Sequence, residues 1–165
     1  MFQKPYNRTA ALAYARRWGR GRNPKYYDFS DLGGDCTNFV SQCVYAGSGV
    51  MNYTPTFGWY YISADDRSPS WAGVEYFYNF MVGNEGLGPH MTEVPVSHLR
   101  PGDVVQLGRA DGSFYHSLFV ARTGFFPSIN NIFIITHSMD SFMRRLNTYD
   151  AEQMRFLHVD YVNAE

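Results

Sequence analysis

The sequence has little cysteine: its 165 residues include two, Cys36 and Cys43. Two thiols cannot build a disulfide framework, so they do not reveal the cellular compartment. On one helix, residues seven apart lie about 10 Å from each other, which is beyond the reach of a disulfide. The short Cys-x₂₋₄-Cys spacing of zinc sites is also missing, so we expect no zinc held by these thiols with His116 and His137.

The sequence also lacks an excess of basic charge and a long apolar run. The net charge is −1, which argues against a nucleic-acid surface. No apolar stretch is long enough to span a bilayer. The first ten residues, MFQKPYNRTA, lack the apolar segment of a secretion signal. The compartment therefore stays open, and an extracellular or cell-wall location would require a signal or a parent chain outside this sequence.

Residues 32–47 read LGGDCTNFVSQCVYAG and carry the strongest local signal. A Gly-Gly turn leads to Asp35, a good helix N-cap, and Cys36 opens a helix that Gly47 can end. A thiol in the first turn feels free N–H groups and the positive end of the helix dipole, which favour the thiolate. Cys36 is therefore a candidate nucleophile, and a small buried hydrophobe is the alternative. Cys43 lies mid-helix among apolar residues, where a thiol is inert.

Helical patterns precede strand patterns along the chain. Helices are predicted over residues 9–18, from Cys36 to Gly47 and over 71–82, with a long loop over 48–70. Strands are predicted over 103–107, 114–122, 131–136 and 155–162, the last as an edge or half-buried strand. This order indicates one α+β domain over residues 1–165 with consecutive antiparallel strands.

Two histidines are predicted to meet at one end of this sheet. His116 begins the strand 114–122 and His137 ends the next one. A hairpin centred near residues 126–127 pairs them, within about 5 Å on one face. With Cys36 they supply a nucleophile, a general base and an orienting group. Asp140 is the alternative orienting residue, and an Asx turn is its structural alternative.

The remaining histidines and the aromatic residues carry weaker signals. His90, His98 and His158 lack comparable neighbours and are expected to be surface or structural residues. Ten aromatics fall between residues 53 and 80. Those in the irregular loop are as compatible with a groove wall for sugar or peptide as with the core; they are Tyr53, Trp59, Tyr60 and Tyr61. Phe57, Phe77 and Phe80 are expected in the core.

Several segments resemble the bacterial putative amidase domain family, a group within the papain-like cysteine peptidases and amidases that also contain NlpC-type and CHAP cell-wall hydrolases. The segments are GGDCTNFVSQ, PSWAGVEYFYNF, LRPGDVVQL, HSLFV and THSMD. The resemblance implies a papain-like fold, with the nucleophile at a helix start packed on a C-terminal antiparallel sheet. It implies Cys36 as nucleophile, His116 as base and, by position, His137 as the orienting residue.

The expected activity is cleavage of an amide through a thioester, acting on cell-wall peptide or glycan–peptide amides. The backbone N–H groups of Cys36 and Asp35 are the expected oxyanion donors. No metal or organic cofactor is required. Two alternatives stay open: a thiol acyltransferase or transglutaminase-like enzyme that uses an amine acceptor, and a catalytically silent wall-binding module.

Overall fold

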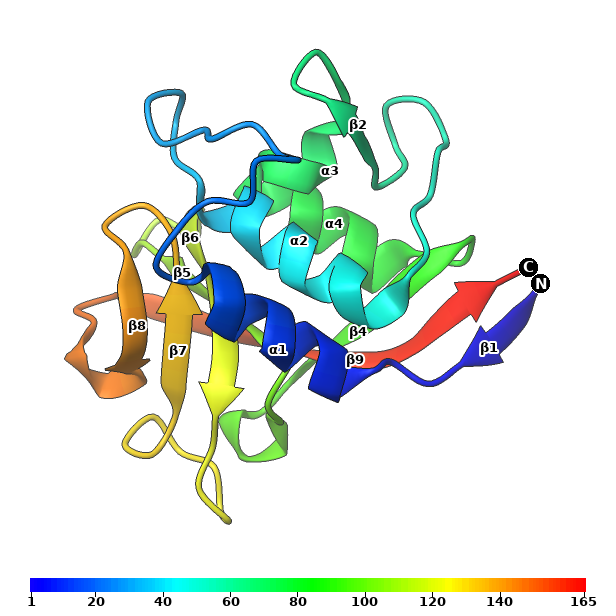
Figure 1. Cartoon of the computed structure of the whole chain (residues 1–165). Coiled ribbons are helices and arrows are strands. Elements are labelled where there is room, and N and C mark those ends of the chain that lie inside the picture. The colour runs from blue at the N-terminus through cyan, green and yellow to red at the C-terminus, as the bar shows by residue number, and fades with distance from the viewer.

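The computed structural model describes all residues, 1–165, as helices packed on an antiparallel sheet (Figure 1). The α-helices are α1 (Arg8–Trp18), α2 (Cys36–Ser48), α3 (Pro69–Ala72) and α4 (Val74–Gly83). The strands are β1 (Phe2–Lys4), β2 (Tyr61–Ser63), β3 (Asp66–Arg67), β4 (Gly88–Val94), β5 (Val104–Gly108), β6 (Phe114–Arg122), β7 (Phe133–Thr136), β8 (Ser141–Arg145) and β9 (Gln153–Ala164). Short 3₁₀ helices cover Val96–His98 and Leu146–Thr148.

Seven strands form the main sheet in the order β1-β9-β5-β6-β7-β8, with β4 also paired to β9. All these pairs are antiparallel, and Phe2 pairs with Ala164, so the two ends of the chain lie together (Figure 1). The helices lie over one face of the sheet, with α2 in contact with α1, α3, β6 and β7. The predicted α+β class, with helices on a C-terminal antiparallel sheet, is confirmed. No helix has both the length and the apolar character required to cross a membrane.

Two hydrophobic clusters occupy the two faces of the sheet. Strand β6 shows the division: Phe119 and Ala121 belong to the cluster under the helices, while Leu118 and Val120 belong to the other. This follows from the two-residue period of a strand. Burying one such large apolar side chain contributes roughly 1.5–3 kcal/mol to the free energy of folding. Side chains on both faces of β6 therefore stabilise the fold.

Helices α1 and α2 begin where the sequence predicts. The Asn7 side chain accepts a hydrogen bond from the Ala10 N–H at 3.0 Å and caps α1. Helix α2 begins at Cys36 and ends before Gly49, which takes the left-handed conformation at φ 67° that favours glycine. Almost every residue of α2 is buried, so tertiary packing stabilises the helix in addition to the helix propensity of its residues.

A buried polar cluster joins the N-terminal helix to the sheet. The Asp103 carboxylate, just before β5, accepts hydrogen bonds from Arg8 Nη1 at 2.8 Å and from the Val159 N–H at 3.0 Å. His158 Nδ1 lies 2.8 Å from the same carboxylate. His158 is therefore structural, as predicted, and His90 similarly bonds Asp160.

Several predicted elements differ from the structure. The segment 48–70 contains the hairpin β2–β3, and the helix expected over 71–82 is divided at Gly73, which has an extended backbone (φ −108°, ψ 129°). The strand expected over 155–162 is not an edge: β9 has partners along both sides. Strands β1, β4 and β8 were not predicted, because short segments with mixed polarity lack a clear period.

Candidate active site

Cys36 opens α2 directly after a glycine turn. Gly33 and Gly34 take φ values of 85° and 107°, a region that favours glycine, and so allow the chain to turn sharply into the helix. The Cys36 side chain is 7% exposed, and its Sγ lies 3.7 Å from the Thr37 hydroxyl. Burial raises the pKa of the Cys36 thiol, while hydrogen bonds from the Ser117 backbone and from Thr37 act in the opposite direction. The sulfur therefore lies among hydrogen-bond donors that favour its anionic form.

Asp35 does not cap α2, contrary to the prediction. Its side chain makes no cap hydrogen bond; it accepts instead from the Phe29 N–H at 2.9 Å and from Asn38 Nδ2 at 2.8 Å. Its other oxygen lies 2.6 Å from His137 Nδ1. The buried carboxylate thus ties the loop before Cys36 to the helix and to the end of the sheet.

The backbone N–H of Asp35 is also occupied, because it donates to the Ser138 hydroxyl. It is therefore not free to stabilise an oxyanion, and the expectation for this group is wrong for the structure as it stands. The Cys36 N–H lies at the first position of α2, where the helix itself provides no acceptor. Of the two predicted donors, the Cys36 N–H is the one that makes no backbone hydrogen bond in the structure.

His137 does not face His116, and the reason is the register. Strand β6 pairs with β7 as Phe119 with Ile135 and Val120 with Ile134, so the same register brings Ser117, not His116, opposite residue 137. The His137 ring is buried, with Nε2 2.9 Å from the Trp18 carbonyl oxygen. Both ring nitrogens are thus used by Asp35 and Trp18, and in this structure His137 does not orient His116.

Asp140 does not contact His116 by a hydrogen bond either. Both of its carboxylate oxygens bind Arg22, at 2.8 Å to Nη1 and 3.0 Å to Nη2. The Arg22 hydrogen bond lowers the pKa of the Asp140 carboxyl. This bidentate pair fixes the turn that follows β7 to the segment between α1 and α2.

His116 lies at the start of β6 with both ring nitrogens free of protein hydrogen bonds. No hydrogen bond joins its ring to Cys36 Sγ in this structure. The two-residue period of β6 turns the His116 side chain to the face of Leu118 and Val120, whereas the Ser117 hydroxyl lies on the helix face beside Thr37. The expected contact between the His116 ring and the Cys36 sulfur is therefore not formed, and the ring centroid lies 6.2 Å from that of Tyr149. Burial and the nearby Arg144 charge lower the pKa of His116 to about 4, which keeps the imidazole neutral at neutral pH. The next residue, Ser117, is the one whose backbone contacts Cys36.

Two cavities meet at Gly34, two residues before Cys36. One, of about 500 Å³, is lined by Arg22, Ser30, Gly34, Tyr115, His116, Ser138, Met139 and Asp140. The other, of about 450 Å³, is lined by Phe29, Leu32, Gly33, Gly34, Arg67, Ser68, Pro69, Ala72, Gly73 and Tyr76. Cys36 itself lines neither. The first cavity is lined by His116, and the second is lined by Arg67 beside Phe29, Leu32 and Tyr76.

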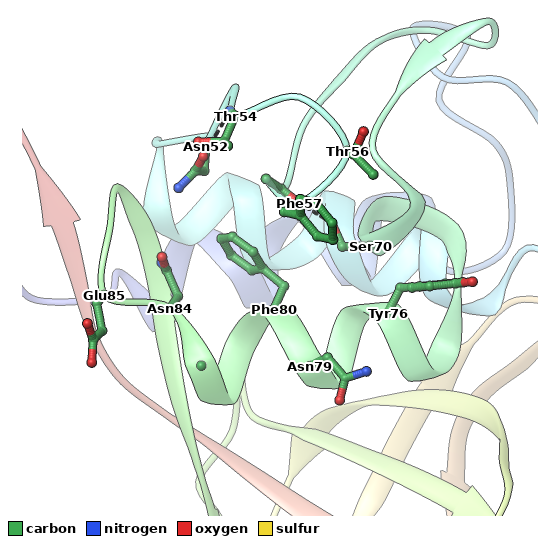
Figure 2. A pocket seen from close by; sticks show the side chains of 12 residues that line it. Asn52, Thr54, Thr56, Phe57, Ser70, Tyr76, Asn79, Phe80, Asn84 and Glu85 are labelled. Carbon is green, nitrogen blue, oxygen red and sulfur yellow. Dashed lines mark hydrogen bonds between the residues drawn. The ribbon is translucent and has the colours of Figure 1, made fainter.

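The aromatic loop is arranged differently from the expectation. Trp59 is fully buried, and its Nε1 donates to the Ser41 hydroxyl at 3.1 Å, so it is a core residue. Tyr60 and Tyr61 are half-buried and pack against the larger cluster. Phe57, expected in the core, is 83% exposed. With Phe80 and Tyr76 of α4 it lines a third cavity of about 450 Å³ (Figure 2).

Three buried polar residues around Cys36 were missed by the sequence analysis. Thr37, Ser117 and Gln106 are all essentially inaccessible to solvent. In the sequence, Thr37 follows Cys36 and Ser117 follows His116. The sequence does not show, however, in which direction the hydroxyl of such a neighbouring residue points. No group of three or more His, Cys, Asp or Glu side chains is arranged to hold a metal ion.

Comparison with known proteins places the chain in a family. It is 34% identical over 131 residues to a protein described as "Uncharacterized protein YhbB" of Bacillus subtilis (strain 168); the match covers 76% of this chain and 40% of that protein. The chain therefore spans well under half the length of this relative. No solved structure gives a significant match. The model of the family described as "Putative amidase domain" matches residues 5–159. The chain belongs to the putative amidase domain family, whose description suggests hydrolysis of amide bonds.

Proposed function

We propose that this chain is a cysteine-dependent amide hydrolase of the papain-like class, with Cys36 as its nucleophile. The observation that carries the proposal is the position of Cys36 in the first turn of α2, where Thr37 and the Ser117 backbone are directed at the sulfur. A thiolate is favoured by a helix N-terminus and by such donors. Family membership supplies the reaction class, the breaking of a C–N bond.

We assign the general base to His116. Three features support this role: a neutral imidazole, two ring nitrogens without protein partners, and a place in the cavity that Gly34 also lines. In the structure the His116 side chain lies on the Leu118 face of β6, and the Ser117 hydroxyl beside Thr37 lies on the other face. Strand β7 ends at Thr136, so no strand pairs with β6 beside His116. Binding of substrate has to bring the ring to the sulfur, a step that is common where catalytic hydrogen bonds tighten only in the complex.

The reaction then proceeds in two stages. Cys36 Sγ loses its proton to His116 and forms a bond to the amide carbonyl carbon, and the Cys36 N–H stabilises the oxyanion. The C–N bond breaks as His116 returns the proton to the departing amine. Water, deprotonated by His116, attacks the thioester; the C–S bond breaks, and a carboxylic acid and the free thiol result.

The two cavities that meet at Gly34 support a substrate that extends to both sides of the scissile amide. One side offers Phe29, Leu32 and Tyr76 together with Arg67, and the other offers Tyr115 and His116 beside the Arg22–Asp140 ion pair. We propose bacterial cell-wall peptide, or the amide that joins it to glycan, as the substrate class, on the analogy of the cell-wall hydrolases that the sequence resembles.

The test is incubation of the protein with purified peptidoglycan, followed by mass spectrometry of the released fragments. Wild type is expected to release fragments with a new carboxylate and a new amine, whereas Cys36→Ala is expected to release none. Cys43→Ala is the matched control. Added amine separates hydrolysis from acyl transfer, because an acyltransferase gives an amide product in place of the acid. Equal release by wild type and Cys36→Ala would refute the proposal.

A further inference from the structure

A continuous chain of buried polar groups runs from Cys36 through the sheet to the surface beside α4. We call it the donor chain, and it consists of Arg155 (β9), Gln106 (β5), Ser117 (β6) and Thr37 (α2). Arg155 Nε donates to Gln106 Oε1 at 2.8 Å, and Gln106 Nε2 donates to the Ser117 hydroxyl at 3.1 Å. The Ser117 and Thr37 hydroxyls lie 2.9 Å apart, and Thr37 Oγ1 lies 3.7 Å from Cys36 Sγ.

The chemistry of Arg155 fixes the orientation of the Gln106 amide in this chain. Because a guanidinium only donates, the oxygen of the Gln106 amide must face it, and the amide nitrogen must face Ser117. The same nitrogen also donates to the Val74 carbonyl at 3.1 Å, which excludes the flipped amide. Because Gln106 Nε2 can only donate, Thr37 is the one partner in the chain to which the Ser117 hydroxyl can donate. With the Ser117 proton on Thr37, the Thr37 proton is available for the Cys36 sulfur. Each dipole thus presents its positive end toward Cys36.

The far end of the donor chain is firmly anchored. Arg155 lies between two aromatic rings, with its guanidinium carbon 3.6 Å from the centroid of Tyr78 and 3.8 Å from that of Phe114. Its Nη2 binds Glu75 on α4 at 2.7 Å. Hydrogen bonds in series polarise one another in a low-dielectric interior. Arg155 therefore holds the Gln106 amide in one orientation at the end of the series, while Glu75 balances its charge.

We propose that the donor chain stabilises the Cys36 thiolate and holds the sulfur in position for attack on substrate. Arg155 and Gln106 are positioning residues, since they act through other groups, whereas Thr37 and the Ser117 backbone contact the sulfur itself. The inference rests on the proposed function, in which Cys36 is the nucleophile, and it identifies what favours the anion. The ionisable group whose charge acts on Cys36 is Asp35, on the loop before α2. The Asp35 charge opposes the thiolate, so the donor chain works against it.

The pH dependence of Cys36 alkylation tests the inference without any substrate. The rate constant for iodoacetamide is measured between pH 5 and 10 by peptide mapping, so that Cys36 and Cys43 are followed separately. Thr37→Val keeps the shape and removes the last hydroxyl, and it is expected to raise the apparent Cys36 pKa by about one unit, a roughly tenfold lower rate at neutral pH. Thr37→Ser restores the hydroxyl and is expected to return the midpoint to within a few tenths of a unit of wild type.

Two further variants separate this effect from a general loss of packing. Ser41→Ala removes another buried hydroxyl of α2, the one bonded to Trp59, and should leave the Cys36 midpoint unchanged. Gln106→Glu replaces the amide donor by a carboxylate that Arg155 can still bind, so Ser117 turns its proton away from Thr37 and the midpoint rises. If Thr37→Val and Gln106→Glu both titrate as wild type does, the inference is wrong, whereas the nucleophile assignment fails only if Cys36→Ala keeps its activity.

Discussion

The two cysteines of α2 lie seven residues apart on one buried helix, and their surroundings differ sharply. Cys36 is at the first turn, among the Thr37 hydroxyl and the Ser117 backbone. Cys43 lies mid-helix in the larger hydrophobic cluster and is fully inaccessible. Burial raises the pKa of both thiols, and that of Cys43 well above its usual range. Polar partners, more than burial, therefore distinguish the two sulfurs.

This comparison supports the proposal that one helix holds a structural thiol, Cys43, and a reactive one, Cys36. A buried thiol without donors is a small hydrophobe. At a helix N-terminus, burial opposes the ionised form of the thiol, whereas free N–H groups and aligned hydroxyls favour it. In this proposal the loop, strand β6 and the helix start together make Cys36 reactive, and their effect is lost nearly two helical turns farther along, at Cys43. The predictions below test this difference.

The largest expected difference concerns activity. Cys36→Ala removes the sulfur that forms the thioester, and amide cleavage should fall by a factor on the order of 10³ or more, the range seen when a nucleophile is removed. Cys43→Ala leaves every group of the site in place and should change the rate by no more than a few-fold. Initial rates of fragment release from peptidoglycan measure both. A Cys36→Ala protein with more than a tenth of wild-type activity contradicts the assignment.

The next difference concerns chemical reactivity. In the folded protein, Cys36 should be alkylated by iodoacetamide at least on the order of 100-fold faster than Cys43, because Cys43 reacts only when α2 opens. Peptide mapping after short pulses at pH 7.5 gives both rates in one sample. In urea the two rates should become equal, which serves as the control. Preferential labelling of Cys43 in the native protein would reverse the comparison.

Local signals explain why much of the fold could be predicted. The glycine turn before Cys36 and the apolar spacing of α2 are contained in one short segment, and the structure places the helix start there. Strands β5 and β6 follow a Pro-Gly turn and an Asp-Gly turn, and both were expected. The α+β class follows from their order along the chain.

The predictions that failed concern features that depend on long-range packing. The position of His137 relative to His116 depends on an irregularity in β6–β7 pairing between Val120 and Arg122, and a shift of one residue turns a side chain to the other face. Trp59 and Phe57 lie in a loop whose apolar residues follow no regular period. The sequence therefore could not show that Trp59 is buried and Phe57 exposed. The donor chain joins residues from α2, β5, β6 and β9, and no sequence spacing reveals such a set.

A smaller effect is expected in the pH dependence of stability, from His116 beside the Cys36 site. Its pKa of about 4 in the folded protein lies below the value of 6.5 for an exposed histidine. Between these two pH values the unfolded chain binds more protons than the folded protein. The free energy of unfolding therefore rises with pH in this range, and the contribution of His116 to it is lost as the pH falls from about 6.5 toward 4. The loss is at most about 3 kcal/mol.

Urea unfolding at pH 7 and at pH 4.5 measures this loss, and His116→Gln should remove most of it because glutamine does not titrate. His98→Gln is the control, since His98 lies in a 3₁₀ helix with no buried residues. The free energy of unfolding of His98→Gln should depend on pH as that of wild type does. An unchanged slope in His116→Gln would show that the ring is not held neutral by its surroundings.

The smallest expected effect is the difference between two serine substitutions. At Cys43, a serine hydroxyl enters a fully buried apolar site, where an incompletely bonded polar group costs about 1–3 kcal/mol. At Cys36, the hydroxyl meets the Thr37 side chain and the Ser117 backbone, so Cys36→Ser should change the free energy of unfolding by less than about 1 kcal/mol. Midpoints of urea unfolding at pH 7 give both values. If Cys36→Ser is the more destabilised variant, the surroundings of the two sulfurs do not differ in the way described, and a donor-rich site at the start of α2 has to be abandoned.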